Sequence, residues 1–478
     1  MPHLKTKVAI IGAGSAGMRA YREVTKTTDD VLLIEDGPYG TTCARVGCMP
    51  SKLLIAAAEA AHAGHNTTAM GVTYGAPQID GHAVMARVRS ERDRFVGFVQ
   101  ETVEDWPEQH RIRARATFVS DTVLELSDGR TVEADSIIIA TGSRPNILPF
   151  FENFGDRLII NDDVFSWDTL PSSVAVFGAG VIGLELGQAL HRLGVKVTLF
   201  GRDNLVGPLS DPEVLAKAAD IFTGEFDFHP HADARNHRRT DNGVAVDLVT
   251  DGTTQTLEYD YALIATGRRP NVDKLGLENT SLELDARGVP IFDVNTGQCG
   301  AAPVFIAGDV NNITPLLHEA ADEGMIAGYN AAHSPDLRRF TKSAPISVVF
   351  SDPQIMMVGD THRALTESGA DFAVGALDWS DQGRARVMGV NKGLLRVYGE
   401  RNTGRFLGAE MIGPRAEHLA HLLAWSLQSR LTVSEMLERP FYHPVIEEGL
   451  RTALRILNAN LQMGAMPPAR CIDCGPGA

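Results

Sequence analysis

The sequence has no apolar run long enough to span a bilayer, which excludes a helical membrane protein. Its first residues lack the basic region, apolar core and small-residue cleavage site of a secretory signal, so we expect a cytoplasmic protein. Basic side chains are in the minority, with 44 Lys and Arg against 60 Asp and Glu and a net charge of −16. That balance disfavours nucleic acid and anionic membranes as partners.

Cysteine is also scarce. Only five occur, at positions 43, 48, 299, 471 and 474. An odd number in a large chain argues against the disulfide framework of a secreted domain. Two close pairs and a singleton are more typical of redox or metal chemistry.

The chain does contain a repeat. Residues 7–17 (KVAIIGAGSAG) and 173–183 (SVAVFGAGVIG) each combine an apolar strand, a glycine-rich turn and a helix start. Each is followed by a second apolar strand that ends in Ala-Thr-Gly, within residues 137–145 and 262–270. The repeat predicts two βαβ dinucleotide-binding units.

The character of the sequence changes near Ala344, where alternating apolar segments and polar turns predict an antiparallel sheet. Helices are expected at about 416–429, 433–437 and 444–461. A chain of 478 residues is too long for one ordinary core. We therefore predict boundaries near 145, 271 and 344.

The first glycine turn fits G-x-G-x-x-G with Gly12, Gly14 and Gly17. Such a turn lets the backbone approach a pyrophosphate, which then lies at the positive end of the following helix. Glu35 follows Gly14 by 21 residues, where a carboxylate accepts hydrogen bonds from a ribose diol. The pattern predicts a dinucleotide site.

The second turn repeats the pattern with Gly178, Gly180 and Gly183, but the same spacing reaches Gly201 and not an acid. Arg202 stands beside it and could accommodate a 2′-phosphate. A single arginine is thin support for NADP. We therefore favour NAD here and leave NADP open.

Cys43 and Cys48 lie in the segment GTTCARVGCMPSK, residues 40–52, with four residues between them. Pro50 and the apolar run after it place Cys48 near a helix start, where the pKa of a thiol is lowered. Zinc sites usually have closer cysteines and a second Cys or His pair, and none lies nearby in sequence. The pair is therefore predicted to be redox-active, with no metal.

With this motif the sequence resembles the class I pyridine nucleotide-disulfide oxidoreductases, most closely their dihydrolipoyl dehydrogenases. The family motif is GGTCLNVGCxPSK, from which this chain departs at Thr41, Ala44 and Arg45. These departures are expected to alter the approach to the disulfide and not its chemistry. The resemblance implies an α/β fold with two Rossmann-like domains, for FAD and NAD, and a C-terminal α+β dimerisation domain. The expected division is FAD-binding 1–145, NAD(P)-binding 146–271, a second FAD-binding or central part 272–343, and dimerisation 344–478.

The resemblance also implies roles for individual residues. Cys43 would be the interchange thiol and Cys48 the charge-transfer thiol against the flavin. Lys52, paired with Glu185, would lie near the flavin N5. The remaining expected cofactor contacts are Asp309 at the ribityl chain, the backbones of Ala116, Gly142 and Leu317 in the FAD site, and Gly267 at the nicotinamide nucleotide.

A thiol that exchanges disulfides needs a general acid and base beside it. His443, in RPFYHPVIEEGLRTAL, resembles the family's His-Pro-x-x-x-Glu segment, with Glu448 five residues on. A carboxylate on the imidazole would fix its tautomer and stabilise the imidazolium. In this family the histidine comes from the partner subunit, which implies a homodimer.

The expected activity is oxidation of dihydrolipoamide, on the lipoyl domain of a carrier protein, with electrons passing through Cys43–Cys48 and FAD to NAD+. An alternative is an NAD(P)H-dependent disulfide reductase, similar to glutathione or thioredoxin reductase, with Cys471 and Cys474 as a relay. The tail pair could equally be incidental or bind metal. A non-catalytic flavoprotein is disfavoured because the set of reactive residues is complete.

Overall fold

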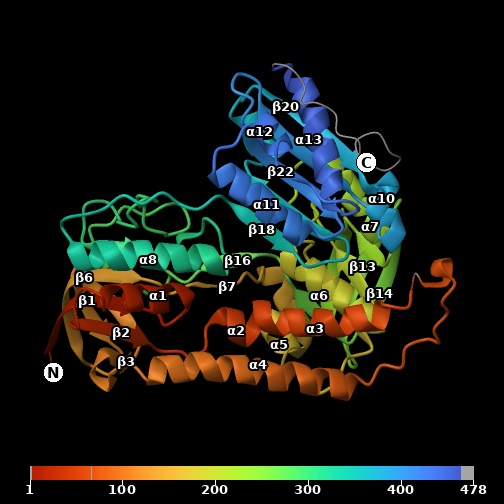
Figure 1. Ribbon diagram of the computed structural model, residues 1–478. Helices are drawn as coiled ribbons and strands as arrows, with labels where there is room; N and C mark the ends of the chain where they lie inside the picture. Colours follow the sequence, from red (N-terminus) through yellow and green to blue (C-terminus); the bar gives the residue numbers. More distant parts are fainter. Residues whose placement is uncertain (1–2, 66, 464–478) are drawn as a thin grey trace.

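Two mainly parallel sheets and one antiparallel sheet form the frame of the molecule (Figure 1). A computed structural model describes residues 3–65 and 67–463. In Figure 1 the first parallel sheet lies at the left, the second at the right and the antiparallel sheet above them. The predicted α/β class, with two dinucleotide-binding units and a C-terminal α+β domain, is confirmed. None of the helices in the described ranges has the length and apolarity that a bilayer crossing requires.

The first sheet is built around β1 (His3–Ile11), whose last four residues are almost fully buried. Strands of a parallel sheet are covered on both faces, which is why this segment is an uninterrupted apolar run. The strand order is β3 (Arg111–Arg113), β2 (Val31–Glu35), β1, β6 (Thr131–Ile139), β5 (Val123–Leu126) and β4 (Ala116–Ser120), and β17 (Val304–Ile306) pairs with the end of β6. The chain therefore returns to its first sheet after completing the second.

The second sheet repeats this plan with five parallel strands. Their order is β11 (Asp227–His229), β10 (Lys196–Phe200), β9 (Ser173–Phe177), β15 (Tyr261–Ile264) and β8 (Leu158–Ile159). An antiparallel meander packs against it through a cluster that contains Phe177 and Phe200. The meander strands are β12 (Asp233–Arg239), β13 (Val244–Thr250) and β14 (Thr253–Tyr259).

Helices α1 (Ser15–Val24) and α6 (Val181–Arg192) follow the two glycine turns, as predicted. On the first unit, α1 packs closely against α8 (Leu317–His333). A Cβ atom at Gly324 of α8 would lie only 2.3 Å from the carbonyl oxygen of Ala16. Small residues at this contact bring the two backbones together and hold the first turn rigidly.

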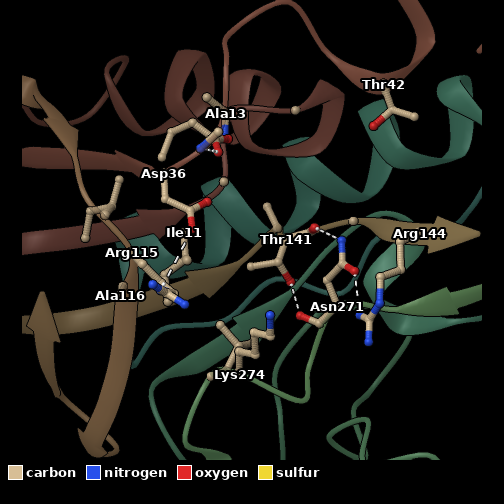
Figure 2. Close-up of a pocket in the computed structure, with 18 of the residues that line it drawn as sticks. Ile11, Ala13, Asp36, Thr42, Arg115, Ala116, Thr141, Arg144, Asn271 and Lys274 are labelled. Carbon is tan, nitrogen blue, oxygen red and sulfur yellow. Dashed lines mark hydrogen bonds and ion pairs between the residues drawn. The ribbon is translucent and has the colours of Figure 1, made fainter. Parts of the chain in front are cut away.

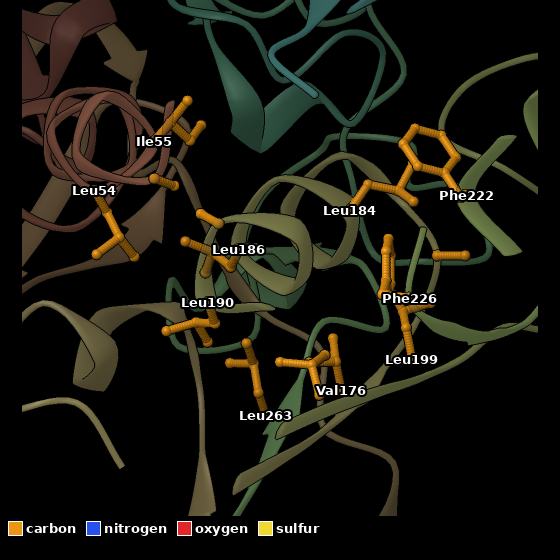
Figure 3. Packing of buried hydrophobic residues seen from close by; sticks show 14 of the residues in the cluster. Leu54, Ile55, Val176, Leu184, Leu186, Leu190, Leu199, Phe222, Phe226 and Leu263 are labelled. Atoms are coloured by element: carbon orange, nitrogen blue, oxygen red, sulfur yellow. The ribbon is translucent and has the colours of Figure 1, made fainter. Parts of the chain in front are cut away.

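The predicted helix start at the second cysteine is confirmed, because α3 spans Cys48–His62 after the short helix α2 (Thr42–Val46). Helix α3 packs between α4 (Gly81–Glu104) and α6. Figure 3 shows Leu54 and Ile55 beside Leu186 of α6, in a cluster that extends to Phe222 of α7 (Pro212–Thr223). Each buried leucine of this kind contributes about 1.5–3 kcal/mol. The thiol-bearing helix is thus fixed to the second nucleotide unit.

The two Ala-Thr-Gly segments meet in an antiparallel ribbon of β7 (Ser143–Pro145) and β16 (Arg268–Pro270). Their hydrogen bonds are reciprocal. Asn271 N donates to Gly142 O at 3.0 Å, and Asn146 N donates to Gly267 O at 2.9 Å. The ribbon therefore braces the two nucleotide units against each other.

The C-terminal part forms the predicted antiparallel sheet. Its order is β18 (Ile346–Val349), β19 (Gln354–Gly359), β22 (Phe406–Gly413), β21 (Leu394–Glu400) and β20 (Phe372–Asp378). The predicted helices are present as α11 (Ala416–Gln428), α12 (Val433–Leu437) and α13 (Glu447–Leu461), the last beginning three residues later than expected. Three short helices complete the fold, namely α5 (Asn161–Val164), α9 (His362–Glu367) and α10 (Gly383–Met388).

A fully buried carboxylate, that of Glu410 on β22, connects this sheet to the second nucleotide unit. It accepts hydrogen bonds from Ser210 N at 2.6 Å, Ser210 Oγ at 2.7 Å and Asp211 N at 2.9 Å. A fourth bond comes from His362 N at 2.8 Å. Three of the four donors belong to the second nucleotide unit, so this one buried side chain joins the two domains by several hydrogen bonds.

Replacing Glu410 by Ala leaves these donors without an acceptor, and we expect the free energy of unfolding to fall by about 3–5 kcal/mol. Urea denaturation at fixed FAD concentration measures the change. Glu410→Gln keeps an acceptor oxygen and should retain part of the stability. Coincident unfolding curves for Glu410→Ala and the unchanged protein would contradict the prediction.

Candidate active site

The first glycine turn has the shape that a dinucleotide requires. A Cβ atom at Gly17 would lie 1.8 Å from Gly12 O, and Gly12 itself has a φ of +108°. These two glycines permit the tight turn and the close helix. A Cβ at Gly14 would meet nothing within 4 Å. The space in front of Gly14 leaves the backbone open to a pyrophosphate.

The second turn reproduces this geometry almost atom for atom. A Cβ at Gly183 would lie 1.8 Å from Gly178 O, and Gly178 has a φ of +110°. Gly180 again faces open space. Both predicted glycine motifs therefore fit a dinucleotide, on the evidence of backbone geometry as well as spacing.

A cavity of about 390 Å³ opens at the first turn (Figure 2). Five of the predicted cofactor residues line it: Gly12, Gly14, Glu35, Ala116 and Gly142. Figure 2 shows Thr141, Asn271 and Lys274 at its margin, so the segment after the second Ala-Thr-Gly completes the wall. A cavity of this size and lining suits the adenosine diphosphate half of FAD.

The two units differ at the end of the second strand. Glu35 at the end of β2 accepts hydrogen bonds from Ala13 N and Gly37 N, both at 2.7 Å, which hold its carboxylate at the cavity. At Gly201 a Cβ would lie 2.7 Å from Pro230 O. The chain after β11 thus fills the place of a carboxylate in the second unit. Arg202 is 87% exposed and pairs with Asp203 at 3.1 Å.

Cys43 and Cys48 lie on consecutive helices as neighbouring thiols, Cys43 half-buried and Cys48 exposed. The hydrogen bond from the Cys43 thiol and the nearby Lys52 ammonium together lower the pKa of Cys48 to about 7, although burial acts in the opposite direction. The same hydrogen bond, together with burial, raises the pKa of Cys43. In the reduced pair the proton therefore belongs to Cys43 and the thiolate to Cys48.

The predicted pair of Lys52 and Glu185 is present, with Lys52 Nζ 2.8 and 3.0 Å from the two carboxylate oxygens. Glu185 is buried on α6 and also accepts from Phe350 N at 2.9 Å. Lys52 Nζ lies 4.4 Å from the centre of the Phe350 ring. Sequence reasoning missed Phe350, because no motif marks a backbone donor that lies 165 residues from its acceptor.

Asp309 follows β17 and accepts a hydrogen bond from Ser143 Oγ at 2.9 Å. Arg268 Nε donates to the same hydroxyl at 2.8 Å, and its second nitrogen donates to Ser143 O at 2.7 Å. Burial lowers the pKa of Arg268, and Asp309 acts against that shift. The ribbon between the units thus holds the predicted ribityl-binding carboxylate. Sequence reasoning missed both Ser143 and Arg268.

His443 and Glu448 are joined as predicted. Nδ1 of His443 lies 2.9 and 3.1 Å from the carboxylate oxygens of Glu448, which is buried. Val445 N also donates to this carboxylate at 3.1 Å. The imidazole is 60% exposed. Within the described part of one chain, no hydrogen bond or ion pair connects His443 to the thiols.

Other predicted residues are placed as follows. Leu317 begins α8, is 48% exposed and does not line the cavity of Figure 2. Gly267 has a φ of +98° and open space where a Cβ would lie. Cys299 is fully buried, and burial raises its pKa to about 12, which suits an inert thiol. Cys471 and Cys474 lie outside the described residues. Among the described residues, no three or more His, Cys, Asp or Glu side chains are grouped so that they could hold a metal ion.

Two dinucleotide folds, a pair of neighbouring thiols and the Lys52–Glu185 ion pair beside them define a nucleotide-dependent dithiol oxidoreductase. Residues 6–324 match the family described as pyridine nucleotide-disulphide oxidoreductase, and residues 346–454 match its dimerisation domain. The chain belongs to this family. It is accordingly an oxidoreductase that uses FAD and a nicotinamide dinucleotide and forms a homodimer.

Relatives with several activities resemble the chain over nearly its whole length. It is 32% identical over 463 residues to dihydrolipoyl dehydrogenase of Haloferax volcanii, which covers 94% of this chain and 95% of that protein. It is 29% identical to mercuric reductase of Shigella flexneri, with 95% and 81% covered. The crystal structure of LpdA from Mycobacterium tuberculosis has a TM-score of 0.79 at 26% identity, covering 94% of this chain and 99% of that one.

Replacing Lys52 by Met should raise the pKa of Cys48 above its value of about 7, because the ammonium stabilises the thiolate and the carboxylate left behind opposes it. The ultraviolet absorbance of the thiolate, followed against pH in reduced apoprotein, measures the midpoint. Lys26→Met, which removes an exposed lysine paired with Glu23, is the matched control. An unchanged midpoint in Lys52→Met would refute the role of Lys52 in lowering the pKa of Cys48.

Proposed function

We propose that the protein is a dihydrolipoyl dehydrogenase. It would oxidise a dihydrolipoyl group, carried on the lipoyl domain of a partner protein, and reduce NAD+. The observation that supports dithiol chemistry is the pair of neighbouring thiols on consecutive helices, with the Lys52–Glu185 ion pair beside Cys48. The pKa of Cys48 is lowered there and that of Cys43 is raised. The dihydrolipoyl dehydrogenases among the relatives support the substrate.

In the oxidised enzyme, Cys43 and Cys48 would form a disulfide. A thiolate of the substrate attacks Cys43 Sγ, the Cys43–Cys48 bond breaks, and the electron pair goes to Cys48 as thiolate. The second substrate thiol then attacks the mixed disulfide, which releases the oxidised lipoyl group and leaves Cys43 protonated. Half-buried Cys43 as the leaving thiol and Lys52 beside Cys48 suit these two steps.

Bound FAD would take the electron pair from the dithiol and deliver it to NAD+. The chain's own contribution is to position this cofactor. Glu35 suits the ribose, Asp309 the ribityl chain, and Lys52 the flavin beside Cys48. The glycines at 178, 180 and 183, with Gly267, would receive the nicotinamide nucleotide.

Each substrate thiol must give up a proton, and we assign its acceptor to His443 of the partner subunit. Glu448 holds Nδ1, so Nε2 is left to exchange the proton. The side chain is exposed in one chain, as an interface residue of a homodimer would be. The dimerisation match over residues 346–454 includes this segment.

We also propose that the domain boundaries lie at 145, 271 and 344.

A second candidate is a disulfide reductase that runs in the opposite direction on NADPH. The geometry at Gly201 favours it, because the strand end carries no carboxylate to reject a 2′-phosphate and Arg202 stands exposed beside it. Cys471 and Cys474 would serve this reaction as a relay. Mercuric reductase among the relatives shows that proteins similar over 95% of this chain include another activity.

Steady-state rates distinguish the two functions. We expect turnover with dihydrolipoamide and NAD+, and slower turnover with NADP+. NADPH with glutathione disulfide or oxidised thioredoxin should give little activity. Faster turnover with NADPH and a protein disulfide than with dihydrolipoamide and NAD+ would reject the dehydrogenase proposal.

Replacing His443 by Gln should reduce turnover of dihydrolipoamide by about 10²–10⁴-fold, because the general base is lost. Flavin binding should stay normal. Glu448→Gln leaves the imidazole in place but removes its charge partner, so a smaller loss is expected. His421→Gln, on an exposed residue of α11, is the control. Full dihydrolipoamide turnover by His443→Gln would overturn the assignment of the base.

A further inference from the structure

Arg45 is one of the three departures from the family's disulfide motif, and the proposed activity gives it no role. The motif has asparagine at this position, whereas this chain has arginine. It lies on α2, two residues after Cys43. The structure places it on the wall of the FAD cavity, together with Thr41 and Thr42, and not at the approach to the thiols alone.

Most charged side chains at this cavity already have partners. Arg144 pairs with Asp273 at 2.5 Å, and Arg115 lies 4.0 Å from Asp36. The carboxylate of Glu35 is held by two backbone amides. Within the described residues, Arg45 makes no hydrogen bond or ion pair. It acts on Asp162 only at longer range, where burial raises the pKa of Asp162 and Arg45 opposes the shift.

The stem of Arg45 is nevertheless confined. Gly40, with a φ of +116°, leaves room for it, since a Cβ there would lie 3.1 Å from Arg45 Cδ and 2.8 Å from a methyl of Val96 on α4. The helix that carries Arg45 is capped by Thr41, whose hydroxyl accepts from Ala44 N at 3.2 Å. At its other end, Asn161 Nδ2 donates to Val46 O at 2.7 Å. Both ends of α2 and the stem of Arg45 are therefore held in place, and the side chain lines the cavity.

We propose that Arg45 binds the diphosphate of FAD. A guanidinium that has no carboxylate partner can donate two parallel hydrogen bonds to a phosphate and offset its negative charge. The neutral amide of asparagine cannot offset that charge. The diphosphate is the anionic part of the cofactor, and the first glycine turn directs it to this cavity. The contact would also tie the helix that carries Cys43 directly to the cofactor.

The test compares Arg45→Asn, which restores the family residue, with Arg45→Lys, which keeps the charge. Apoprotein is titrated with FAD, and the quenching of flavin fluorescence gives the dissociation constant. We expect Arg45→Asn to bind FAD about 10- to 100-fold more weakly, and Arg45→Lys to bind within a few-fold of the unchanged protein. The difference should shrink as salt is raised.

Two competitors locate the effect. ADP and adenosine are each titrated against bound FAD. If Arg45 binds the diphosphate, Arg45→Asn weakens ADP and leaves adenosine unchanged. Equal weakening of both ligands would mean a general distortion of the cavity and would overturn the proposal, as would an FAD dissociation constant within twofold of the unchanged protein.

Arg94→Asn is the matched control, because it removes one positive charge from α4 near Val96 without lining the cavity. It should leave both competitors unaffected. If Arg45→Asn does not fold, as judged by circular dichroism of the apoprotein, Arg45→Gln and Arg45→Lys decide the question. Retention by lysine and loss by glutamine supports the proposal, and equal affinities refute it. None of these measurements depends on the substrate of the enzyme.

Discussion

The geometry around the thiols depends on the carboxylate of Glu185. It lies on α6 of the second nucleotide unit, receives Lys52 from the thiol-bearing helix and accepts Phe350 N from the C-terminal domain. Three parts of the chain therefore meet at one buried anion. Its loss would leave the partly exposed Lys52 ammonium without a carboxylate partner beside Cys48. The charge that tunes the thiol is also the contact that assembles the domains.

A second constraint places the two nucleotide units relative to each other. The segments Ala-Thr-Gly-Ser-Arg-Pro-Asn, 140–146, and Ala-Thr-Gly-Arg-Arg-Pro-Asn, 265–271, exchange equivalent backbone bonds. The hydroxyls of the two threonines, Thr141 and Thr266, likewise donate to the carbonyls of Asn271 and Asn146, each at 2.8 Å. The contact is thus two-fold symmetric in its bonding, and Asn271 from the second segment also lines the cavity of the first unit. The repeated Ala-Thr-Gly segments therefore also hold the two nucleotide units together.

Local patterns predicted most of the fold and the reactive residues. Glycine spacing placed both turns, the position of Glu35 followed from its distance along the chain, and the proline after Cys48 indicated the start of α3. Long-range partners were not predictable, because Phe350 and Ser143 act through positions that only the tertiary fold brings near Glu185 and Asp309. The roles of these residues and the domain boundaries stay predictions. The departure at Arg45 was expected to affect access to the disulfide, and its place on the cofactor cavity needed the path of α2.

The two units share one glycine motif but differ at the strand end that would contact a ribose. In the first, Glu35 is held by two amides at the strand end, so its acceptor oxygens are fixed before the nucleotide arrives. In the second, the carbonyl of Pro230 occupies the place where such a side chain would begin. A carboxylate cannot be restored there by substitution alone, since the loop after β11 would have to move. The neighbouring Arg202 is 87% exposed, so the charge that it offers near this strand end is screened by solvent. The charge beside the thiols is held by a buried carboxylate, whereas the charge at this strand end lies on the surface.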